Sequence, residues 1–388
     1  MYYFLYYHTA RTTPIPLACK LCMRYAREEL RNCMSVSVGI VGLPNVGKST
    51  LFETLTSRQV SAQNYPFCTI DPNVGTVAVP DPRVDKLAHL SRSAEVKPTT
   101  MEFIDIAGLV RGAHEGEGLG NAFLANIREV DAICQVLREF PDESVTHVET
   151  RVNPLGDADI INTELLLADL AQIERSLENI EKKAKQGDKW AVDTREVLQR
   201  LYQAVAAEVP IRDLELTNQE KDLIKSYNFL TEKPMMYVVN TDESYETSLT
   251  ANQLGGNVIP LSVKSEAELS TLSPEERTEY LELLGRSHSG LDIVIEEGYN
   301  LLDLISFFTT GPKETRAWTV PEGTHAPQAA GVIHSDFERG FIGAEVAPFE
   351  QFIEAGGEGP AREQGIMRLE GKNYVMKDGD VCVFRANT

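Results

Sequence analysis

The amino-acid sequence predicts an α/β fold with a doubly wound, mostly parallel sheet, an inserted helical hairpin and a small α+β domain at the end. Three observations predict this arrangement. Short β-rich runs alternate with helix-length segments from residue 36 onward. Apolar residues between 166 and 184 recur at coiled-coil spacing, and strand-like runs after residue 304 are separated by Gly and Pro. The expected units are an extension at 1–33, a sheet domain at 34–162 and 230–304, a helical insertion at 163–229 and a terminal domain at 305–388.

Several runs have the length and composition of buried strands. The first, Val36 to Val41, leads into a glycine turn and then a helix from Lys48 to about Leu55. Parallel strands require long crossover connections, so helices between strands predict parallel neighbours. The expected strands of the sheet domain are 36–41, 101–105, 132–137, 235–239 and 258–261. Those of the terminal domain are 317–320 and 381–384, with a helix at about 327–337.

The helical insertion has a seam of apolar residues rather than a broad apolar face. The seam positions are spaced 4-3-4-3-4, and the pattern breaks near Gly187 before a returning arm. This predicts an antiparallel hairpin that projects from the sheet domain, with a core helix pair as the alternative. Charged residues between the seam positions favour projection. The seam residues are Leu166, Leu170, Ile173, Leu177, Ile180 and Ala184, and those of the returning arm are Leu198, Leu201 and Val205.

Composition excludes several classes of protein. The chain has 388 residues, and 37 Lys and Arg against 58 Asp and Glu give a net charge of −21. A hydrophobic fraction of 42% is typical of a globular protein and not of a disordered one. No apolar run approaches the ~20 residues of a membrane-spanning helix, so no membrane association is expected. A broad basic field is missing, which argues against a DNA-binding protein.

The first 33 residues differ from the rest of the chain. They begin with an aromatic cluster and carry five basic and two acidic residues, but they lack the apolar core of a signal peptide. We expect this extension to be unstructured or untranslated, with translation starting at Met34; a transit peptide is the alternative.

Six cysteines are too few for a disulfide scaffold, and a lone Cys19-x-x-Cys22 is a weak metal signal. A reducing, cytoplasmic compartment is therefore expected.

The segment from Gly42 to Ser49 matches G-x-x-x-x-G-K-[ST] and stands between a strand and a helix. Its glycines let backbone N–H groups surround phosphates, and the helix N-terminus adds partial positive charge. Lys48 would bridge the β- and γ-phosphates, and Ser49 would offer its hydroxyl to Mg²⁺. The motif therefore predicts a nucleoside-triphosphate site.

Two further segments complete this expected site. Asp105 ends a strand, where it can hold Mg²⁺ through water, and Gly108 can donate its N–H to the γ-phosphate. Glycines then recur up to residue 120, as in a loop that must change conformation with the phosphate. Upstream, Thr69 is placed to be a second direct Mg²⁺ ligand. Leu109 cannot polarise water, so we expect slow intrinsic turnover.

The residues after the strand at 235–239 predict which base is bound. GTPases place Asn-Lys-x-Asp here, and the Asp accepts two hydrogen bonds from guanine. In this chain the motif starts at Asn240 and ends at Glu243, one methylene longer, so the bidentate geometry for guanine is lost. The sequence therefore predicts ATP over GTP. Ser262 follows the next strand, in the expected position of the last base-contacting loop.

Taken together, these motifs resemble the YchF family of Obg-like ATPases from Met34 to Thr388. The resemblance implies a ribosome-binding ATPase with a coiled-coil hairpin and a TGS domain, in which Asn45, Val46, Gly47, Lys48, Ser49 and Thr50 hold ATP, and Ser49 and Thr69 hold Mg²⁺. One residue departs from the family pattern: Gln135 stands where relatives usually have a histidine proposed to act in hydrolysis, which leaves Gln135 as a candidate to orient the attacking water. The resemblance rests on the following segments: the phosphate loop; Asp105-Ile106-Ala107-Gly108-Leu109-Val110; Gly116-Glu117-Gly118-Leu119-Gly120-Asn121; Asn240-x-x-Glu243; and Phe307 to Trp318 with His334-Ser335-Asp336-Phe337.

Ribosome binding has to be reconciled with an acidic chain. The expected hairpin tip carries four lysines against two acidic residues between 181 and 189. We expect Lys182, Lys183 and Lys185 to contact rRNA phosphates; a solvated turn is the alternative. The chain is expected to act as a monomer. A GTP-dependent ribosome-assembly factor, or a stress-linked binding protein in which hydrolysis is incidental, are the competing hypotheses.

Overall fold

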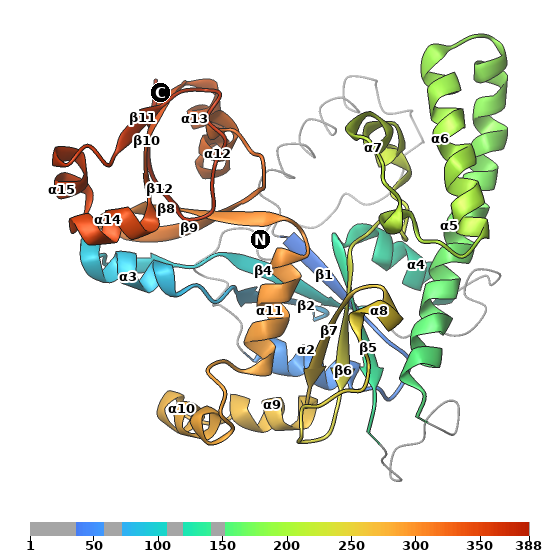
Figure 1. Ribbon diagram of the computed structural model, residues 1–388, viewed down its shortest axis with the longest axis horizontal. Coiled ribbons are helices and arrows are strands. Elements are labelled where there is room, and N and C mark those ends of the chain that lie inside the picture. The colour runs from blue at the N-terminus through green and yellow to red at the C-terminus, as the bar shows by residue number, and fades with distance from the viewer. Residues whose placement is uncertain (1–35, 58–71, 107–118, 141–151, 388) are drawn as a thin grey trace, which may run out of the picture.

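The computed structural model describes residues 36–57, 72–106, 119–140 and 152–387. In this part of the chain, two six-stranded sheets lie next to each other, and a long pair of helices projects beside the first sheet (Figure 1). The extension at 1–33 and two expected site residues, Thr69 and Gly108, lie outside the described residues.

The first sheet confirms the predicted doubly wound α/β fold. Its strand order is β2-β4-β1-β5-β6-β7, and only β2 runs antiparallel to its neighbour. All five runs predicted as strands of this domain are present, with bounds that differ by at most a residue or so. The strands are β1 (Val36–Val41), β2 (Val74–Ala78), β4 (Thr100–Asp105), β5 (Ala132–Arg138), β6 (Met235–Asn240) and β7 (Asn257–Leu261).

Helices cover both faces of this sheet. A Cβ at Gly298 of α11 would contact Val38, Met101 and Met236, so α11 lies on the face that carries these residues. On the opposite face, Tyr237 contacts α5 (Pro154–Lys185), where its hydroxyl accepts a hydrogen bond from Asn162 at 3.2 Å. The helices of this unit are α2 (Lys48–Thr56), α4 (Leu119–Glu129), α8 (Ala251–Leu254), α9 (Val263–Ser270), α10 (Pro274–Leu283) and α11 (Gly290–Asn300).

The projecting pair consists of α5 (Pro154–Lys185) and α6 (Lys189–Ala206). All six predicted seam residues lie in apolar clusters with residues of α6, including Leu198, Leu201 and Val205. The expected boundary between residues 162 and 163 falls inside α5, because the first turns of this helix pack into the sheet core through Ala158 and Ile161. The chain returns through η2 (Ile211–Asp213), α7 (Asn218–Ile224) and η3 (Lys225–Tyr227).

The second sheet has the order β11-β10-β12-β8-β9-β3. Its strands are β8 (Leu304–Thr310), β9 (Glu314–Pro321), β10 (Phe341–Pro348), β11 (Arg368–Glu370) and β12 (Asp380–Ala386), together with β3 (Glu95–Lys97) from the first part of the chain. The single helix expected at 327–337 is two helices, α12 (Ala326–Ile333) and α13 (Ser335–Arg339), because His334 adopts an extended conformation between them. Two further helices are α14 (Phe349–Ala355) and α15 (Glu358–Glu363).

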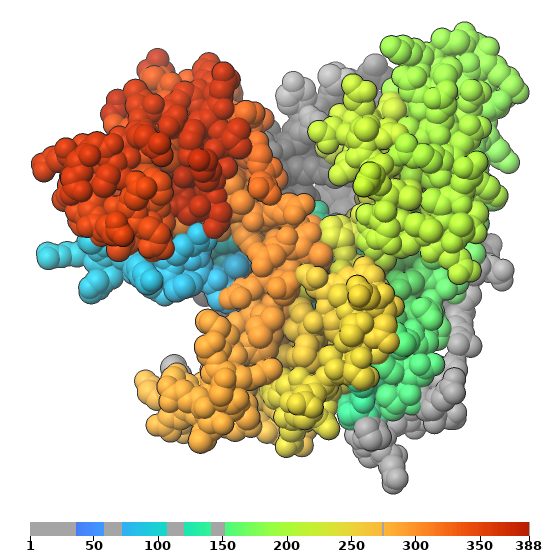
Figure 2. Space-filling model, in the orientation of Figure 1, coloured from blue at the N-terminus to red at the C-terminus, as the bar shows by residue number. Residues whose placement is uncertain are grey.

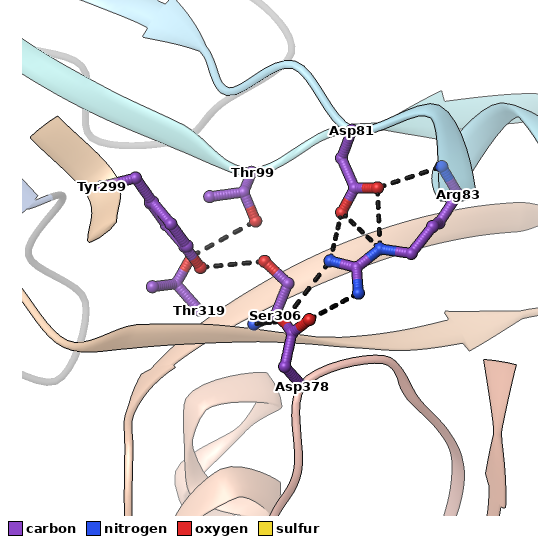
Figure 3. Close-up of polar contacts among 7 residues, drawn as sticks. All are labelled: Asp81, Arg83, Thr99, Tyr299, Ser306, Thr319 and Asp378. Atoms are coloured by element: carbon purple, nitrogen blue, oxygen red, sulfur yellow. Dashed lines mark hydrogen bonds and ion pairs between the residues drawn. The ribbon is translucent and has the colours of Figure 1, made fainter. Parts of the chain in front are cut away.

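The expected terminal domain is therefore not made from residues 305–388 alone. β3 pairs in parallel with β9, and the preceding helix α3 (Pro82–Ser91) buries Val84 and Leu87 among residues of the second sheet and α14. Figure 3 shows the polar side of this joint, where Tyr299 of α11 contacts Ser306 and Thr319. The excursion from β2 through α3 and β3 to β4 thus connects the two sheets.

In the part of the chain that the structure describes, we find no helix long and apolar enough to cross a membrane.

Candidate functional site

The phosphate loop lies at the carboxyl end of β1, between this strand and α2. Gly47 has a φ of 97°, and a Cβ at this position would collide with the side-chain amide of Asn240. A Cβ at Gly42 would lie 2.9 Å from the carbonyl oxygen of Val136. Both glycines are therefore required by the local backbone and its close neighbours. The structure brings the loop to the edge of the sheet where β1, β4, β5 and β6 end, as the sequence predicts.

The first turn of α2 is available to bind an anion. Its N-cap, Gly47, offers no side-chain oxygen to the helix, and the first turn contains no acidic residue. The backbone N–H groups at this end therefore have no capping acceptor within the helix, which favours a phosphate. Ser49 and Thr50 are exposed here, and Asn45 adopts a φ of 66° in the loop before them.

Lys48 and Asp105 form a charged pair beside the phosphate loop. The Lys48 ammonium group forms an ion pair with the carboxylate of Asp105 at the end of β4. The exposed hydroxyl of Ser49 follows Lys48 in α2, so oxygen donors are present at this edge of the sheet. Mg²⁺ commonly takes one or two protein oxygens, with waters and substrate phosphates as its other ligands. The residues therefore fit this ion, although Thr69 lies outside the described residues.

Asn240 connects the base-binding segment to the phosphate loop. Its side-chain nitrogen donates to the carbonyl oxygen of Val46 at 3.0 Å, and its side-chain oxygen accepts from the backbone N–H of Val263 at 3.2 Å. The residue is buried at the end of β6. One side chain thus holds together the phosphate loop, the end of β6 and the start of α9.

The two acidic residues after Asn240 have different surroundings. Asp242 accepts hydrogen bonds from the hydroxyl and the backbone N–H of Ser244, at 2.5 and 2.9 Å, and these bonds hold the pKa of its carboxyl below the ordinary value. The side chain of Glu243 is 76% exposed, and its carboxylate lies 3.5 Å from the Lys264 ammonium group. Asp242 is therefore engaged within its own turn, whereas Glu243 is accessible to a ligand.

Ser262 is buried between β7 and α9. Its hydroxyl caps α9, where it accepts from the backbone N–H of Ser265 at 3.4 Å and lies 2.9 Å from the Ser265 hydroxyl. This hydroxyl is directed at the helix, so the structure gives Ser262 a capping contact. Its predicted role in base binding stays a prediction.

Gln135 occupies the middle of β5 and is fully buried. It pairs in register with Tyr237, on the sheet face covered by α5, and its side-chain nitrogen donates to the carbonyl oxygen of Asp157 at 3.5 Å. Among the described residues, its side-chain oxygen has no hydrogen-bond partner. The contact that the structure provides is therefore with the first turn of α5. The water-orienting role stays a prediction, as does that of Gly108 outside the described residues.

Sequence reasoning missed the residues that support the base-binding segment. The Tyr245 hydroxyl donates to Glu266 at 3.4 Å, and the Arg286 guanidinium lies 4.0 Å from the centre of the Tyr245 ring. Glu139, which directly follows β5, accepts from the backbone N–H of Ser248 at 3.1 Å. These partners are far apart in the sequence and form no motif, so no local signal identified them.

A phosphate loop at the carboxyl edge of a parallel sheet, with Lys48 beside Asp105 and Asn240 bound to the loop, defines a P-loop NTPase. Comparisons with known proteins identify the group within this class. Residues 37–167 match a family model described as a 50S ribosome-binding GTPase. Residues 304–387 match the C-terminal model of YchF GTPases, which is described as a protein of unknown function.

The chain belongs to the YchF family. It is 50% identical over 362 residues to the ribosome-binding ATPase YchF of Haemophilus influenzae, covering 91% of this chain and 100% of that protein. The Bacillus subtilis protein of the same name is 48% identical over 365 residues, with the same coverage. The structure of the Schizosaccharomyces pombe YchF GTPase aligns with a TM-score of 0.79 and 38% identity, over 90% of this chain and 98% of that chain.

Proposed function

We propose that this protein is an ATP-binding and ATP-hydrolysing regulatory P-loop NTPase that associates with the ribosome. The observation that carries the proposal is the Asn240 side chain, which binds the phosphate loop and leaves Glu243 exposed beside it. The same conclusion is supported by relatives that are named ribosome-binding ATPases and are 50% and 48% identical to this chain over their full length. Switch segments near Thr69 and Gly108 would couple the bound nucleotide to ribosome association.

In this proposal the phosphate loop holds the triphosphate. Backbone groups from Asn45 to Thr50 surround the phosphates, and Lys48 leaves Asp105 for the β- and γ-phosphates when the nucleotide binds. Ser49 and Thr69 would hold Mg²⁺ directly, and Asp105 would do so through water. The ion, when bound, would neutralise charge on the phosphates. With no polar side chain at Leu109, intrinsic turnover is slow.

The base preference follows from the acceptor at Glu243. Asp242 is engaged by Ser244, so Glu243 is the carboxylate of this loop that can reach a base. Its extra methylene disfavours the bidentate pairing that guanine requires, whereas adenine offers an amino donor. The competing reading is a GTP-dependent ribosome-assembly factor. It is favoured by the matching family model described as a GTPase.

The remaining parts of the chain would make the ribosome contacts. Lys182, Lys183 and Lys185 at the tip of the α5–α6 hairpin would bind rRNA phosphates, and the second sheet would act as a TGS domain. The protein would work as a cytoplasmic monomer. Association through a few lysines is expected to weaken steeply with salt, because each neutralised phosphate releases counterions.

Calorimetric titration of the full chain with ATP and GTP tests the nucleotide part. We expect tighter binding of ATP, a loss of binding in Lys48→Ala, and a shift toward GTP in Glu243→Asp. Tighter binding of GTP by the unaltered protein would favour the GTPase reading. Co-sedimentation with ribosomes in the presence of ATP, ADP, GTP or no nucleotide tests the second part. Pelleting that is absent under all four conditions would contradict ribosome association.

A further inference from the structure

The hairpin tip carries a large aromatic side chain in an unusual position. Trp190 lies in the first turn of α6 and is 49% exposed. The apolar cluster at this end of the hairpin consists of Ile180, Ala184 and Ala191, with Val192 against it, and Trp190 is not part of it. About half of this side chain therefore faces solvent, so part of its ring is available to a partner.

The acidic residues of the tip are engaged within it. The Glu181 carboxylate lies 3.1 Å from Lys185 and 3.8 Å from Arg195. Asp188 caps α6 by accepting from the backbone N–H of Ala191 at 2.9 Å. The positive charge of the tip is therefore only partly neutralised by its own acidic residues.

Three lysines remain without an acidic partner within the described part of the chain: Lys182, Lys183 and Lys189, all exposed. Lys182 and Lys183 stand in the last turn of α5, where the helix dipole favours a cation. Lys189 instead begins α6, where the dipole disfavours it, and no acidic residue stands in that first turn. Lys189 is therefore a cation that the dipole of its own helix disfavours and that is exposed to a polyanionic partner.

The backbone of the tip is well defined. Gly187 has a φ of 80°, and a Cβ added at this position would meet no other atom within 4 Å. Its N–H donates to the carbonyl oxygen of Ala184 at 3.0 Å. The N–H of Asp188 donates to Lys183 at 3.3 Å, so the turn between the helices is closed by hydrogen bonds. In Figure 2 the light-green residues of the hairpin extend to the upper right corner of the molecule, away from the orange and red residues of the second sheet. The backbone that carries these side chains is therefore fixed before a partner binds.

We propose that Trp190 is a stacking platform for an unpaired RNA base, and that Lys182, Lys183 and Lys189 bind the flanking phosphates. This proposal rests on the ribosome association proposed above and identifies the chemistry recognised at the tip. Lysines alone bind the phosphates of paired and unpaired RNA equally well, whereas stacking on an aromatic ring requires a base with a free face. The tip therefore selects single-stranded or looped RNA over a duplex.

Fluorescence titration of the full chain with a short polyadenosine RNA tests the stacking directly. The chain has two tryptophans, and Trp318 is already stacked on Phe307 and covered by Arg316, so it gives a constant background. We expect quenching by the single strand, little quenching by a duplex RNA of equal length, and no quenching in Trp190→Phe. Quenching that is equal for both RNAs, or that persists in Trp190→Phe, would overturn the proposal.

Affinity and its salt dependence separate the two kinds of contact. Trp190→Ala should weaken single-strand binding about tenfold and leave the salt slope unchanged, while Trp190→Phe should retain most of the affinity. Replacing Lys182, Lys183 and Lys189 by Ala should lower the slope of log K against log salt by about 2. Tyr280→Ala, an exposed aromatic on α10, is the matched control and should bind like the unaltered protein.

Ribosome pelleting distinguishes failure of this proposal from failure of the proposed function. If the unaltered chain pellets and Trp190→Ala pellets equally well at every salt concentration, the stacking platform is wrong and ribosome association stands. If Trp190→Ala loses pelleting but the unaltered chain shows no quenching with single-stranded RNA, the tip binds a protein and the RNA assignment is wrong. If the unaltered chain binds the RNA but never pellets, the ribosome association fails and the stacking assignment stands.

Discussion

Arg83 and Asp378 are 295 residues apart in the sequence and are joined by hydrogen bonds of 2.6 and 3.3 Å (Figure 3). The same guanidinium binds Asp81 and lies 5.0 Å from the centre of the Phe308 ring. Burial acts to lower the pKa of Arg83, but its hydrogen bonds to Asp81 and Asp378 outweigh burial and raise that pKa. Asp378 also accepts from the backbone N–H of Ser306 at 3.0 Å. The Arg83 guanidinium of α3 therefore stays charged and links this helix to Asp378, which is itself bound to the second sheet at Ser306.

Removing this guanidinium should loosen the joint between the sheets. We expect Arg83→Ala to lower the free energy of unfolding by about 1 to 2 kcal/mol, discounted for the half-exposed carboxylate of Asp378. Urea denaturation measures the change. Arg339→Ala removes an exposed ion pair with Asp336 and should stay within about 0.5 kcal/mol. Equal effects of the two variants would contradict the role given to Arg83.

Asn240 should increase the affinity for nucleotide through its contact with the phosphate loop. Asn240→Ala removes the hydrogen bonds to Val46 and Val263, and two such bonds correspond to about 2 kcal/mol, or roughly 30-fold in the Kd for ATP. Calorimetry checks this value. Asn257→Ala serves as the control, because Asn257 binds Glu297 at an exposed site. An unchanged Kd in Asn240→Ala would show that the phosphate loop holds its shape alone.

Gln135 either supports the first turn of α5 or orients the attacking water, and one substitution distinguishes these two roles. Gln135→Leu keeps the approximate volume and removes the contact to the Asp157 carbonyl. Because the side chain is fully buried against α5, we expect lower thermal stability and little change in turnover at saturating ATP. A residue that positions the attacking water would instead cost about 100-fold in turnover. Such a loss would restore Gln135 as a catalytic candidate.

Two cysteines should resist modification in the folded protein. Burial raises the pKa of the Cys134 thiol to about 12, and burial also raises the pKa of Cys382. At pH 8 about one Cys134 in ten thousand is then the reactive thiolate. Peptide mapping after alkylation should find both residues unlabelled without urea and labelled in its presence. Rapid labelling of folded Cys134 would support a redox-linked role instead.

The sheet strands and the phosphate loop were predictable because their signals are local. The five predicted strands of the first sheet are short apolar runs, and the Gly42 to Ser49 motif specifies both its turn and its ligand chemistry. The sixth strand, β2, was not predicted, because glycine and threonine interrupt the apolar pattern of its sequence, Val-Gly-Thr-Val-Ala. The seam of the hairpin was predictable for the same reason, since six residues repeat along one helix. The beginning of α5 was misjudged because its first turns pack against the sheet and not against α6.

The joint between the sheets could not be predicted from local patterns. β3 is three residues long, and Glu95-Val96-Lys97 is too short for an alternation to be recognised. It forms a strand because β9 supplies its partner, with Glu95 opposite Glu314. The support of the base-binding loop by Tyr245 and Arg286 depends in the same way on packing between distant segments.

The 32 residues of α5 form a single helix with a length of about 48 Å. One end contacts Gln135 on the strand beside the phosphate loop, and the other end carries the lysines of the tip. A helix of this length behaves as a lever, because a small tilt at its base displaces its far end by a much larger distance. The end of α5 that carries the lysines would then amplify movements that begin beside the nucleotide.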